Sequence, residues 1–154
     1  KDLTLDLNFK YSLGNDVYNY QRSQMEASNN IWNQTTAVVN RWKFDGHQTY
    51  MPRAMSPLSE NWVNNERFSD RWIEDGSYLR LSNASISYSF SFKKKNAFLR
   101  YLSLTLSGKN LFCLTRYSGY DPDVNIYGKV LKYGIDMGAY PAGRTFMFDV
   151  KLNF

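Results

Sequence analysis

The sequence predicts an all-β fold, in which four antiparallel strands form the C-terminal part of a large transmembrane β-barrel. Three observations lead to this fold class. Four segments of the 154-residue chain alternate between apolar and polar residues, the period of a strand with two different faces. Each segment has about 9–11 residues, enough for a tilted strand to cross the hydrocarbon core of a bilayer. The polar faces are rich in Ser, Thr and Asn, and the apolar faces end in aromatic rings, as interfacial girdles require.

The first two predicted strands cover about residues 2–11 and 77–92. The first has an apolar side chain at every odd position from Leu3 and ends in Phe9 and Tyr11. In the second, apolar residues from Ala84 onward alternate with serine. Each strand therefore has one apolar face and one small, polar face.

The second strand contains one break in phase. Leu79 and Leu81 are out of register with Ala84 and the apolar positions that follow it. Either a β-bulge lies around Ser82 and Asn83, or both leucines face the barrel lumen under a packed loop. We favour the second arrangement, because barrel strands often project beyond the membrane.

The last two predicted strands cover about residues 99–111 and 143–154. Leu102, Leu104 and Leu106 alternate with polar residues in the third strand. The fourth alternates in the same way up to the aromatic residue at position 154. Both segments have the pattern of a strand with one lipid-facing side.

The connections between the strands are unequal in length. Residues 93–98 form a short polar turn, whereas residues 12–76 and 112–142 form long connections. Successive connections in an antiparallel barrel alternate between its two ends, so both long connections lie at the same end and the short turn at the other. Outer-membrane barrels have this asymmetry. We therefore expect two extracellular loops and one periplasmic turn, with a helix over residues 20–40, where apolar residues recur at helical spacing.

Composition excludes several other classes of protein. The single cysteine, Cys113, rules out an intrachain disulfide framework and a multi-cysteine zinc site. His47 is the lone histidine, and no nucleophile and base are spaced for catalysis, so we expect neither an enzyme nor a catalytic or metal-ligating residue. The net charge of +5 comes without a broad basic face, so no nucleic acid is expected as a partner.

Four strands cannot close a barrel, because the smallest membrane barrels have about eight. Unpaired edges would expose backbone polar groups to lipid. The chain is therefore interpreted as part of a larger barrel. A soluble antiparallel sandwich, which also alternates, is the alternative that composition leaves open.

Three ordered motifs resemble the SusC/RagA family of TonB-dependent transporters. They are residues 67–83, which include Glu74-Asp75-Gly76-Ser77-Tyr78-Leu79-Arg80-Leu81; Asn110-Leu111-Phe112 with the following residues 117–122; and residues 134–146. The resemblance covers nearly the whole chain. Cys113-Leu114 and Asp149 depart from the family pattern.

The resemblance implies a barrel of about 22 strands whose N-terminal plug domain is not in this chain. It further implies active import of large nutrients, oligosaccharides or peptides, across the outer membrane of a bacterium. The implied partners are a SusD-like surface lipoprotein, the TonB complex, the rest of the barrel and outer-membrane lipid. Alternative functions are a soluble all-β carbohydrate-binding module and a segment of a passive porin.

Two groups of residues are candidates for local function. The final strand resembles the signal by which barrels are recognised for assembly, carried by Phe146, Phe148, Val150, Leu152 and Phe154. Loop aromatics and one acid are candidates for contact with substrate or with the lipoprotein: Trp42, Trp62, Tyr117, Tyr120, Asp121, Tyr127 and Tyr140.

No cofactor is expected. Residues 121–125 match the start of a calcium-binding loop, but Ile126 replaces the turn glycine and Lys132 replaces the bidentate glutamate. We therefore do not expect calcium. Asp121 is instead expected to form an Asx turn with Pro122 that fixes the loop.

Overall fold

A computed structural model describes residues 2–29, 31–92, 98–124 and 133–154. It divides into two compact units, which are treated separately below. The sheet unit consists of Lys1–Gly14, Ser77–Arg116 and Pro141–Phe154. The loop unit consists of Asn15–Gly76 and Tyr117–Tyr140. In the described part of the chain, no helix is long and apolar enough to cross a membrane.

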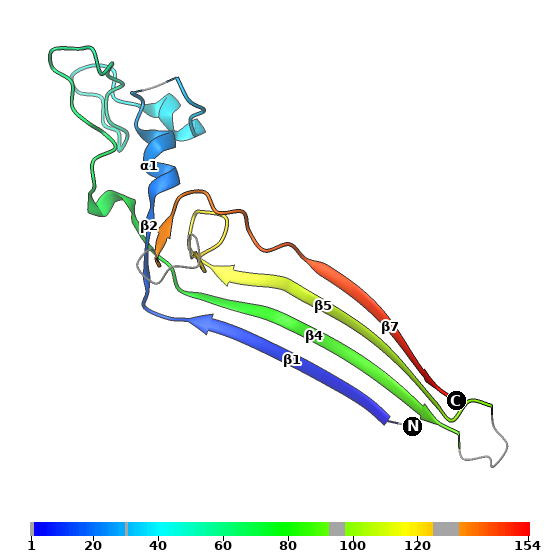
Figure 1. Cartoon of the computed structure of the whole chain (residues 1–154). Coiled ribbons are helices and arrows are strands. Elements are labelled where there is room, and N and C mark those ends of the chain that lie inside the picture. The colour runs from blue at the N-terminus through cyan, green and yellow to red at the C-terminus, as the bar shows by residue number, and fades with distance from the viewer. Residues whose placement is uncertain (1, 30, 93–97, 125–132) are drawn as a thin grey trace. The chain divides into compact units, whose positions relative to one another are not determined.

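Four long antiparallel strands form the sheet unit, which confirms the predicted fold class. They are β1 (Asp2–Ser12), β4 (Tyr78–Ser91), β5 (Tyr101–Thr115) and β7 (Thr145–Asn153), paired in the order β1-β4-β5-β7 (Figure 1). β5 continues past the predicted end at residue 111, because it pairs with β4 as far as Thr115.

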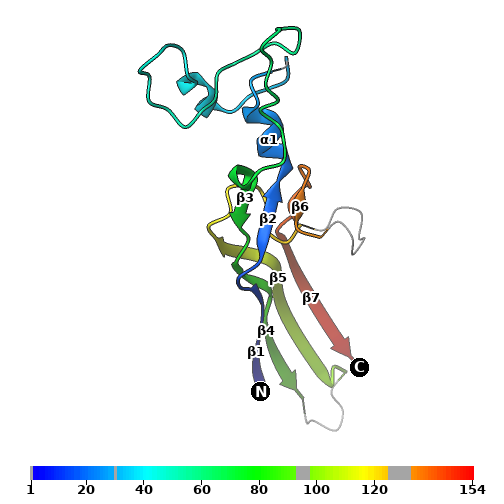
Figure 2. The ribbon, with the colours of Figure 1, turned by 90° about the vertical axis from the view of Figure 1, so that its left-hand side faces the viewer.

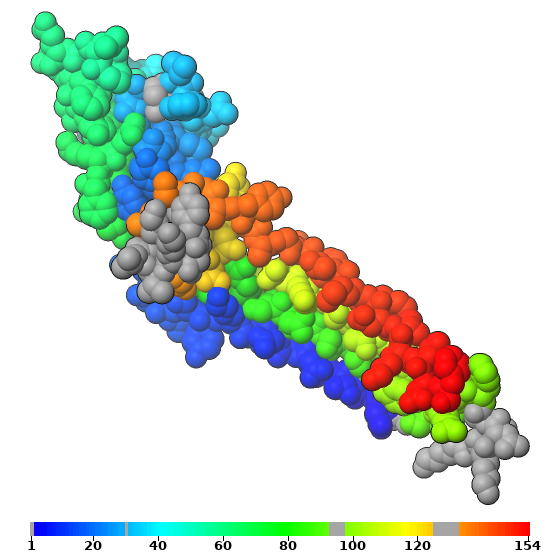
Figure 3. All heavy atoms as spheres, in the orientation of Figure 1, coloured from blue at the N-terminus to red at the C-terminus, as the bar shows by residue number. Residues whose placement is uncertain are grey.

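The register places apolar side chains in rows that cross all four strands. In one row Leu5, Ile86, Leu106 and Phe148 are neighbours on β1, β4, β5 and β7. All four side chains are exposed. Figure 3 shows β1 (blue) and β7 (red) along the two edges of this sheet. The sheet unit therefore presents an exposed apolar row that crosses all four strands.

The opposite face of the sheet carries hydroxyl groups that bond across the strands. Ser87 Oγ lies 2.8 Å from Thr105 Oγ1, and Ser89 Oγ donates to Ser103 Oγ at 3.3 Å. Such cross-strand pairs fix the register. These hydrogen bonds satisfy the hydroxyl groups of small side chains within the sheet.

The phase break in β4 is a β-bulge, and the favoured lumen-facing position of Leu79 and Leu81 is wrong. Along β1, consecutive residues Asn8 and Phe9 pair with Asn83 and Leu81, so Ser82 is the extra residue. Leu79 pairs with Tyr11 in the same register. Directly opposed residues share a face, so both leucines lie on the apolar face.

Short strands in the loop unit form a second sheet. β2 (Asp16–Asn19) lies between β3 (Ile73–Asp75), to which it is antiparallel, and β6 (Ile135–Asp136), to which it is parallel (Figure 2). These strands were not predicted, because two to four residues are too few to show a period. The sheet joins the two long connections of the chain.

The predicted helix over residues 20–40 is wrong in its length. α1 (Tyr20–Glu26) ends early, and the segment ends in a separate 3₁₀ helix, η1 (Thr36–Asn40). Ser28 has φ of 55°, a left-handed conformation that a continuing helix does not allow. Ile31, one of the apolar residues at helical spacing in this segment, is 100% exposed.

The core of the loop unit is small. Val17, Tyr117 and Val124 form its buried cluster, against which Ala139 packs. Gly76 approaches β2 so closely that an added Cβ would lie 2.6 Å from Cγ2 of Val17. A second 3₁₀ helix, η2 (Asp70–Trp72), precedes β3.

Candidate functional site

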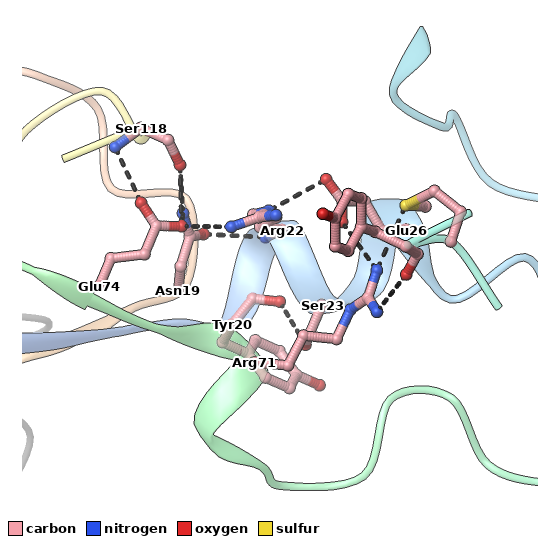
Figure 4. A network of polar contacts seen from close by, with 10 residues as sticks. Asn19, Tyr20, Arg22, Ser23, Glu26, Arg71, Glu74 and Ser118 are labelled. Atoms are coloured by element: carbon pink, nitrogen blue, oxygen red, sulfur yellow. Dashed lines mark hydrogen bonds and ion pairs between the residues drawn. The ribbon is translucent and has the colours of Figure 1, made fainter. Parts of the chain in front are cut away.

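Glu74, on β3, is the centre of a polar network in the loop unit (Figure 4). Its Oε1 accepts hydrogen bonds from Ser118 Oγ at 2.8 Å, Arg22 Nη1 at 2.9 Å and Asn19 Nδ2 at 3.1 Å. Its Oε2 accepts one from the backbone N–H of Ser118 at 2.9 Å. One carboxylate thus joins residues from both long connections.

Arg22 continues the network along α1. Its Nε donates to Glu26 Oε1 at 3.0 Å, one helical turn further on. The guanidinium groups of Arg22 and Arg71 lie 5.8 and 5.0 Å from the ring centroid of Trp72. Trp72 is 1% exposed. Two cations around one buried ring anchor η2 against α1.

Local structure explains why these side chains meet. In the antiparallel pair of β2 and β3, Glu74 lies opposite Val17, so Asn19, two residues further along β2, is its diagonal neighbour on the same face. Asn19 is also the N-cap of α1, and its Oδ1 accepts a hydrogen bond from the backbone N–H of Arg22 at 2.9 Å. One asparagine therefore starts the helix and binds the central carboxylate.

The network shifts the acidity of its members. Burial alone would raise the pKa of Glu74, but hydrogen bonds from Ser118, Arg22 and Asn19 outweigh it and hold this pKa below its ordinary value. Burial would likewise lower the pKa of Arg22, yet hydrogen bonds and charge attraction from Glu26 and Glu74 raise it. Both groups are therefore charged at neutral pH.

A second buried contact joins β6 to the loop that follows β5. Tyr117 Oη donates to Asp136 Oδ2 at 2.6 Å. Asp136 Oδ1 accepts hydrogen bonds from the backbone N–H groups of Gly138 at 2.8 Å and Ala139 at 3.3 Å. Burial and the bond to this carboxylate raise the pKa of Tyr117. These contacts order the turn after β6.

A cavity of about 550 Å³ lies along α1. It is bordered by polar groups of the network and by residues next to it. Its lining residues are Asn19, Gln21, Arg22, Met25, Glu26, Thr35, Ser118, Gly119 and Tyr120. This cavity is the candidate binding site of the loop unit.

The structure separates the residues predicted to contact substrate or lipoprotein. Tyr120 borders the cavity and is exposed, whereas Tyr117 is buried in the core of the loop unit. Asp121 makes the predicted Asx turn, since its Oδ1 accepts a hydrogen bond from the backbone N–H of Asp123 at 2.9 Å. Tyr127 lies outside the described residues. Among the described members of this set, only Tyr120 borders the cavity.

The tryptophans of that set lie elsewhere in the loop unit. Trp42 is half-buried, and the guanidinium of Arg53 lies 5.7 Å from its ring centroid. Trp62 and Tyr140 are exposed. Their contact role stays a prediction.

Four residues of the predicted assembly signal, Phe146, Phe148, Val150 and Leu152, lie on one face of β7, and Phe154 directly follows this strand. The four pair with the apolar positions of β5, from Leu102 opposite Leu152 to Gly108 opposite Phe146. The aromatic ring of Phe154 lies 4.9 Å from that of Phe98, centroid to centroid. The whole set is exposed: Phe146, Phe148, Val150, Leu152 and Phe154.

Sequence reasoning missed most of the polar network. The spacing of Arg22 and Glu26, four residues apart within a predicted helix, was a usable signal. Asn19 and Glu74 are 55 positions apart in the chain, and Glu74 and Ser118 are 44 apart. No local pattern predicts contacts over such separations.

Comparison with known proteins identifies the family. TonB-dependent receptor P3 of Formosa agariphila is 32% identical over 161 residues, a match that covers 100% of this chain and 15% of that receptor. The chain belongs to the SusC/RagA family of TonB-dependent transporters. TonB-dependent receptor SusC of Bacteroides thetaiotaomicron is 27% identical over 164 residues, 100% of this chain and 14% of that receptor. No protein-family model matches the chain.

A solved structure agrees with this assignment to the SusC/RagA family. The RagAB peptide transporter superposes with a TM-score of 0.78 and 25% identity, covering 99% of this chain and 16% of that one. This SusC/RagA segment thus matches the C-terminal part of a TonB-dependent barrel. It spans about one seventh of the length of the relatives it matches.

The motifs that resemble the SusC/RagA family coincide with the contacts of the loop unit. Glu74 and Gly76 come from the first motif, Tyr117 and Ser118 from the second, and Asp136 from the third. The hydrogen bonds of Glu74 to Ser118 and of Tyr117 to Asp136 therefore join all three. Each of the three motifs thus contributes residues to the contacts of the loop unit.

Proposed function

We propose that the chain is part of the wall of a bacterial outer-membrane transporter that imports large nutrients at the expense of energy from the TonB complex. The observation that carries this proposal is the sheet unit, with one exposed apolar face across four strands and one hydroxyl-rich face. Lipid covers the apolar face and the lumen borders the polar face. A soluble carbohydrate-binding module would bury such an apolar face in its own core.

The proposed orientation follows from the family. The connection at residues 93–98, of which 93–97 lie outside the described residues, is proposed to be periplasmic, and the loop unit, built from the connections at 12–76 and 112–142, to be extracellular. The outer edges of β1 and β7 pair with other strands of the barrel, which removes unpaired backbone groups from the bilayer. A plug domain in the remainder of the receptor fills the lumen.

The proposed partner outside the cell is a SusD-like lipoprotein. The relatives include a receptor named SusC and a transporter named RagAB. Exposed loop side chains, among them Trp62 and Tyr140, offer contacts to that lipoprotein or to cargo. The cargo classes are oligosaccharides and peptides, and no catalytic role or cofactor is proposed.

The exposed face of β7 is proposed as the assembly signal. A strand that ends in an aromatic residue and has apolar residues at every second position offers an edge for strand addition by the insertion machinery. Phe154 is the terminal anchor of this strand, and Leu152 and Val150 extend the same face.

The proposed function is tested with the intact receptor in its own cells. We expect the receptor in the outer-membrane fraction, and we expect labelled oligosaccharides or peptides to accumulate in cells that have both receptor and TonB. Deleting either gene should abolish accumulation. Uptake that persists without TonB would instead support a passive porin, and recovery of the receptor in the soluble fraction would refute the membrane assignment.

A further inference from the structure

The apolar face of the sheet unit contains a hollow near its centre. The volume of this cavity is about 280 Å³. Its floor consists of Ala84 and Gly108, which lie directly opposite each other on β4 and β5. Their neighbours in the same row are the exposed side chains of Leu7 on β1 and Phe146 on β7. Two small residues between two large ones leave a hollow in this row.

Larger side chains border the hollow on its other sides. Leu5, Ile86 and Leu106 belong to the next row and line it. Leu111 lines it on the side nearer the end of β5 at Thr115. The hollow is thus bordered by side chains from all four long strands.

A β-bulge brings Leu111 to this face. Gly108 and Leu111 are separated by an odd number of positions, so a regular strand would point them to opposite faces. Asn110 has φ of 53°, and both Asn110 and Leu111 face Ser82 on β4. An added Cβ on Gly108 would lie 2.7 Å from Cδ2 of Leu111, which shows that Leu111 leans over the floor. The bulge therefore builds one border of the hollow.

The position and chemistry of the hollow define its ligand. Gly108 is the middle residue of β5 (Tyr101–Thr115). In a membrane-spanning strand this position lies in the hydrocarbon core, away from the headgroups. The two bordering serines, Ser85 and Ser107, pair with each other one position away from the floor, so their side chains belong to the opposite face. The other described residues that line the hollow are apolar, and it therefore favours a hydrocarbon chain.

We propose that the hollow binds the end of one acyl chain of a membrane lipid. The inference rests on the proposed function, because that function places the apolar face against the bilayer. An unfilled hollow would leave its lining without van der Waals partners on one side. A volume of about 280 Å³ is roughly twice that of an apolar cavity that holds one benzene molecule, so it admits the last few methylene groups of a chain. A chain in the hollow contacts protein on several sides, so the bound lipid exchanges more slowly than lipid beside an exposed row.

The test uses the full-length receptor, reconstituted into phosphatidylethanolamine vesicles. A small fraction of the lipid carries a diazirine near the methyl end of one palmitoyl chain. Light releases nitrogen from the diazirine, the resulting carbene inserts into a neighbouring C–H bond, and mass spectrometry of peptides locates each adduct. Leu7 is the internal reference, because it lies in the same row, is 53% exposed and does not line the hollow.

We expect adducts on Ala84 and Leu111 to exceed those on Leu7 about fivefold, the preference given by a few additional van der Waals contacts. Lipid that only moves across the face would give the opposite order, because Ala84 and Leu111 are half-buried. The proposal is overturned if Leu7 is labelled as strongly as these two residues. It is also overturned if neither of them is labelled and the receptor sediments as a dimer, since a second copy would then occupy the hollow.

Two substitutions fill the hollow without introducing a polar group. Ala84→Leu raises the floor, and we expect it to lower the labelling of Leu111 about fivefold, to the level of Leu7. Gly108→Ala is the milder variant, because its Cβ displaces only the side chain of Leu111, and it carries the comparison if Ala84→Leu does not fold. Val150→Leu is the control, since Val150 lies on the same apolar face and does not line the hollow. Unchanged labelling in a folded filling variant would refute the acyl-chain site.

The same labelling separates this proposal from the proposed function. If Leu7 and Val150 acquire adducts and the hollow does not, the acyl-chain site fails and the membrane wall stands. If no residue of the apolar face acquires an adduct, the membrane assignment itself fails. Heat-modifiable migration of each variant shows whether its barrel is folded.

Discussion

The sheet unit and the loop unit are stabilised in opposite ways. The sheet unit has regular backbone pairing over four long strands, and its apolar face is exposed. The loop unit has little regular structure, but it contains a buried core and a network of charged groups around Glu74. The first unit depends on its surroundings to cover apolar surface. The second is held together by internal contacts between segments distant in the chain.

The largest expected effect comes from replacing Trp72, and it should be confined to the loop unit. Replacing this buried ring by alanine leaves a cavity and should destabilise the loop unit by about 3–5 kcal/mol. Hydrogen exchange of the full-length receptor should increase in the loop unit and stay unchanged in the four long strands. Trp62→Ala is the control, because that side chain is exposed. Equal exchange in the two variants would contradict the anchoring role of Trp72.

A charge on the apolar face should act on the sheet unit instead. Leu106→Arg is expected to cost about 2–4 kcal/mol if the residue lies near the midplane of the bilayer. Its neighbour on the other face of β5, Thr105, provides the matched variant Thr105→Arg, for which we expect a much smaller loss. The amount of folded, heat-modifiable receptor in outer membranes measures both. If the two variants reduce folded receptor equally, the assignment of faces is incorrect.

The charge network gives the stability of the loop unit a dependence on pH. The pKa of Glu74 is lower in the folded protein than its ordinary value of 4.5. Its stabilising contribution is therefore complete above pH of about 4.5 and is lost as the pH falls through the depressed value. Limited proteolysis of the loop unit should accelerate over that range.

Glu74→Gln should remove this dependence and, by weakening charge-assisted hydrogen bonds, cost about 1.5–3 kcal/mol at neutral pH. Glu60→Gln, at an exposed position, should leave the pH profile of proteolysis as in the wild type. A Glu74→Gln profile that still steepens in acid would show that another group is responsible.

The smallest expected effect concerns the end of β7. Phe154→Ala removes the ring contact with Phe98, worth about 0.5–1.5 kcal/mol. If Phe154 is also the assembly anchor, the yield of folded barrel should fall by more than this loss of stability explains. Phe98→Ala removes the same contact and leaves the anchor in place. Equal yields of the two variants would show that Phe154 acts only as a girdle residue and not as an assembly anchor.

The same comparison explains what the sequence could predict. Successive side chains on a strand point to opposite faces, so the four long strands and their apolar faces could be predicted from the sequence alone, from Leu3 to Phe154. The phase break at Leu79 and Leu81 was visible, but its cause depended on pairing with β1. The family resemblance, confirmed by comparison, came from motifs that span both units.

The candidate site was largely hidden from sequence reasoning. Apolar residues at helical spacing predicted a helix past Glu26, yet Ile31 is exposed and Ser28 breaks the helix. Tyr120 was predicted as a contact residue and borders the cavity. Glu26 was not, because its burial results from tertiary packing rather than from any local pattern.

The bulge at Ser82 has a consequence for how this strand can change length during evolution. Because Ser82 is the extra residue opposite β1, a gene that loses this codon still encodes a strand with Leu81 and Ala84 on one face and Arg80 on the other. Loss of a single codon at Ser87, within the regular pairing, would invert every side chain on one side of the deletion. On the other side of β4, however, Asn110 and Leu111 of β5 both face Ser82, so losing this codon would leave them with no facing residue, and the two neighbours of β4 constrain its length here in opposite directions.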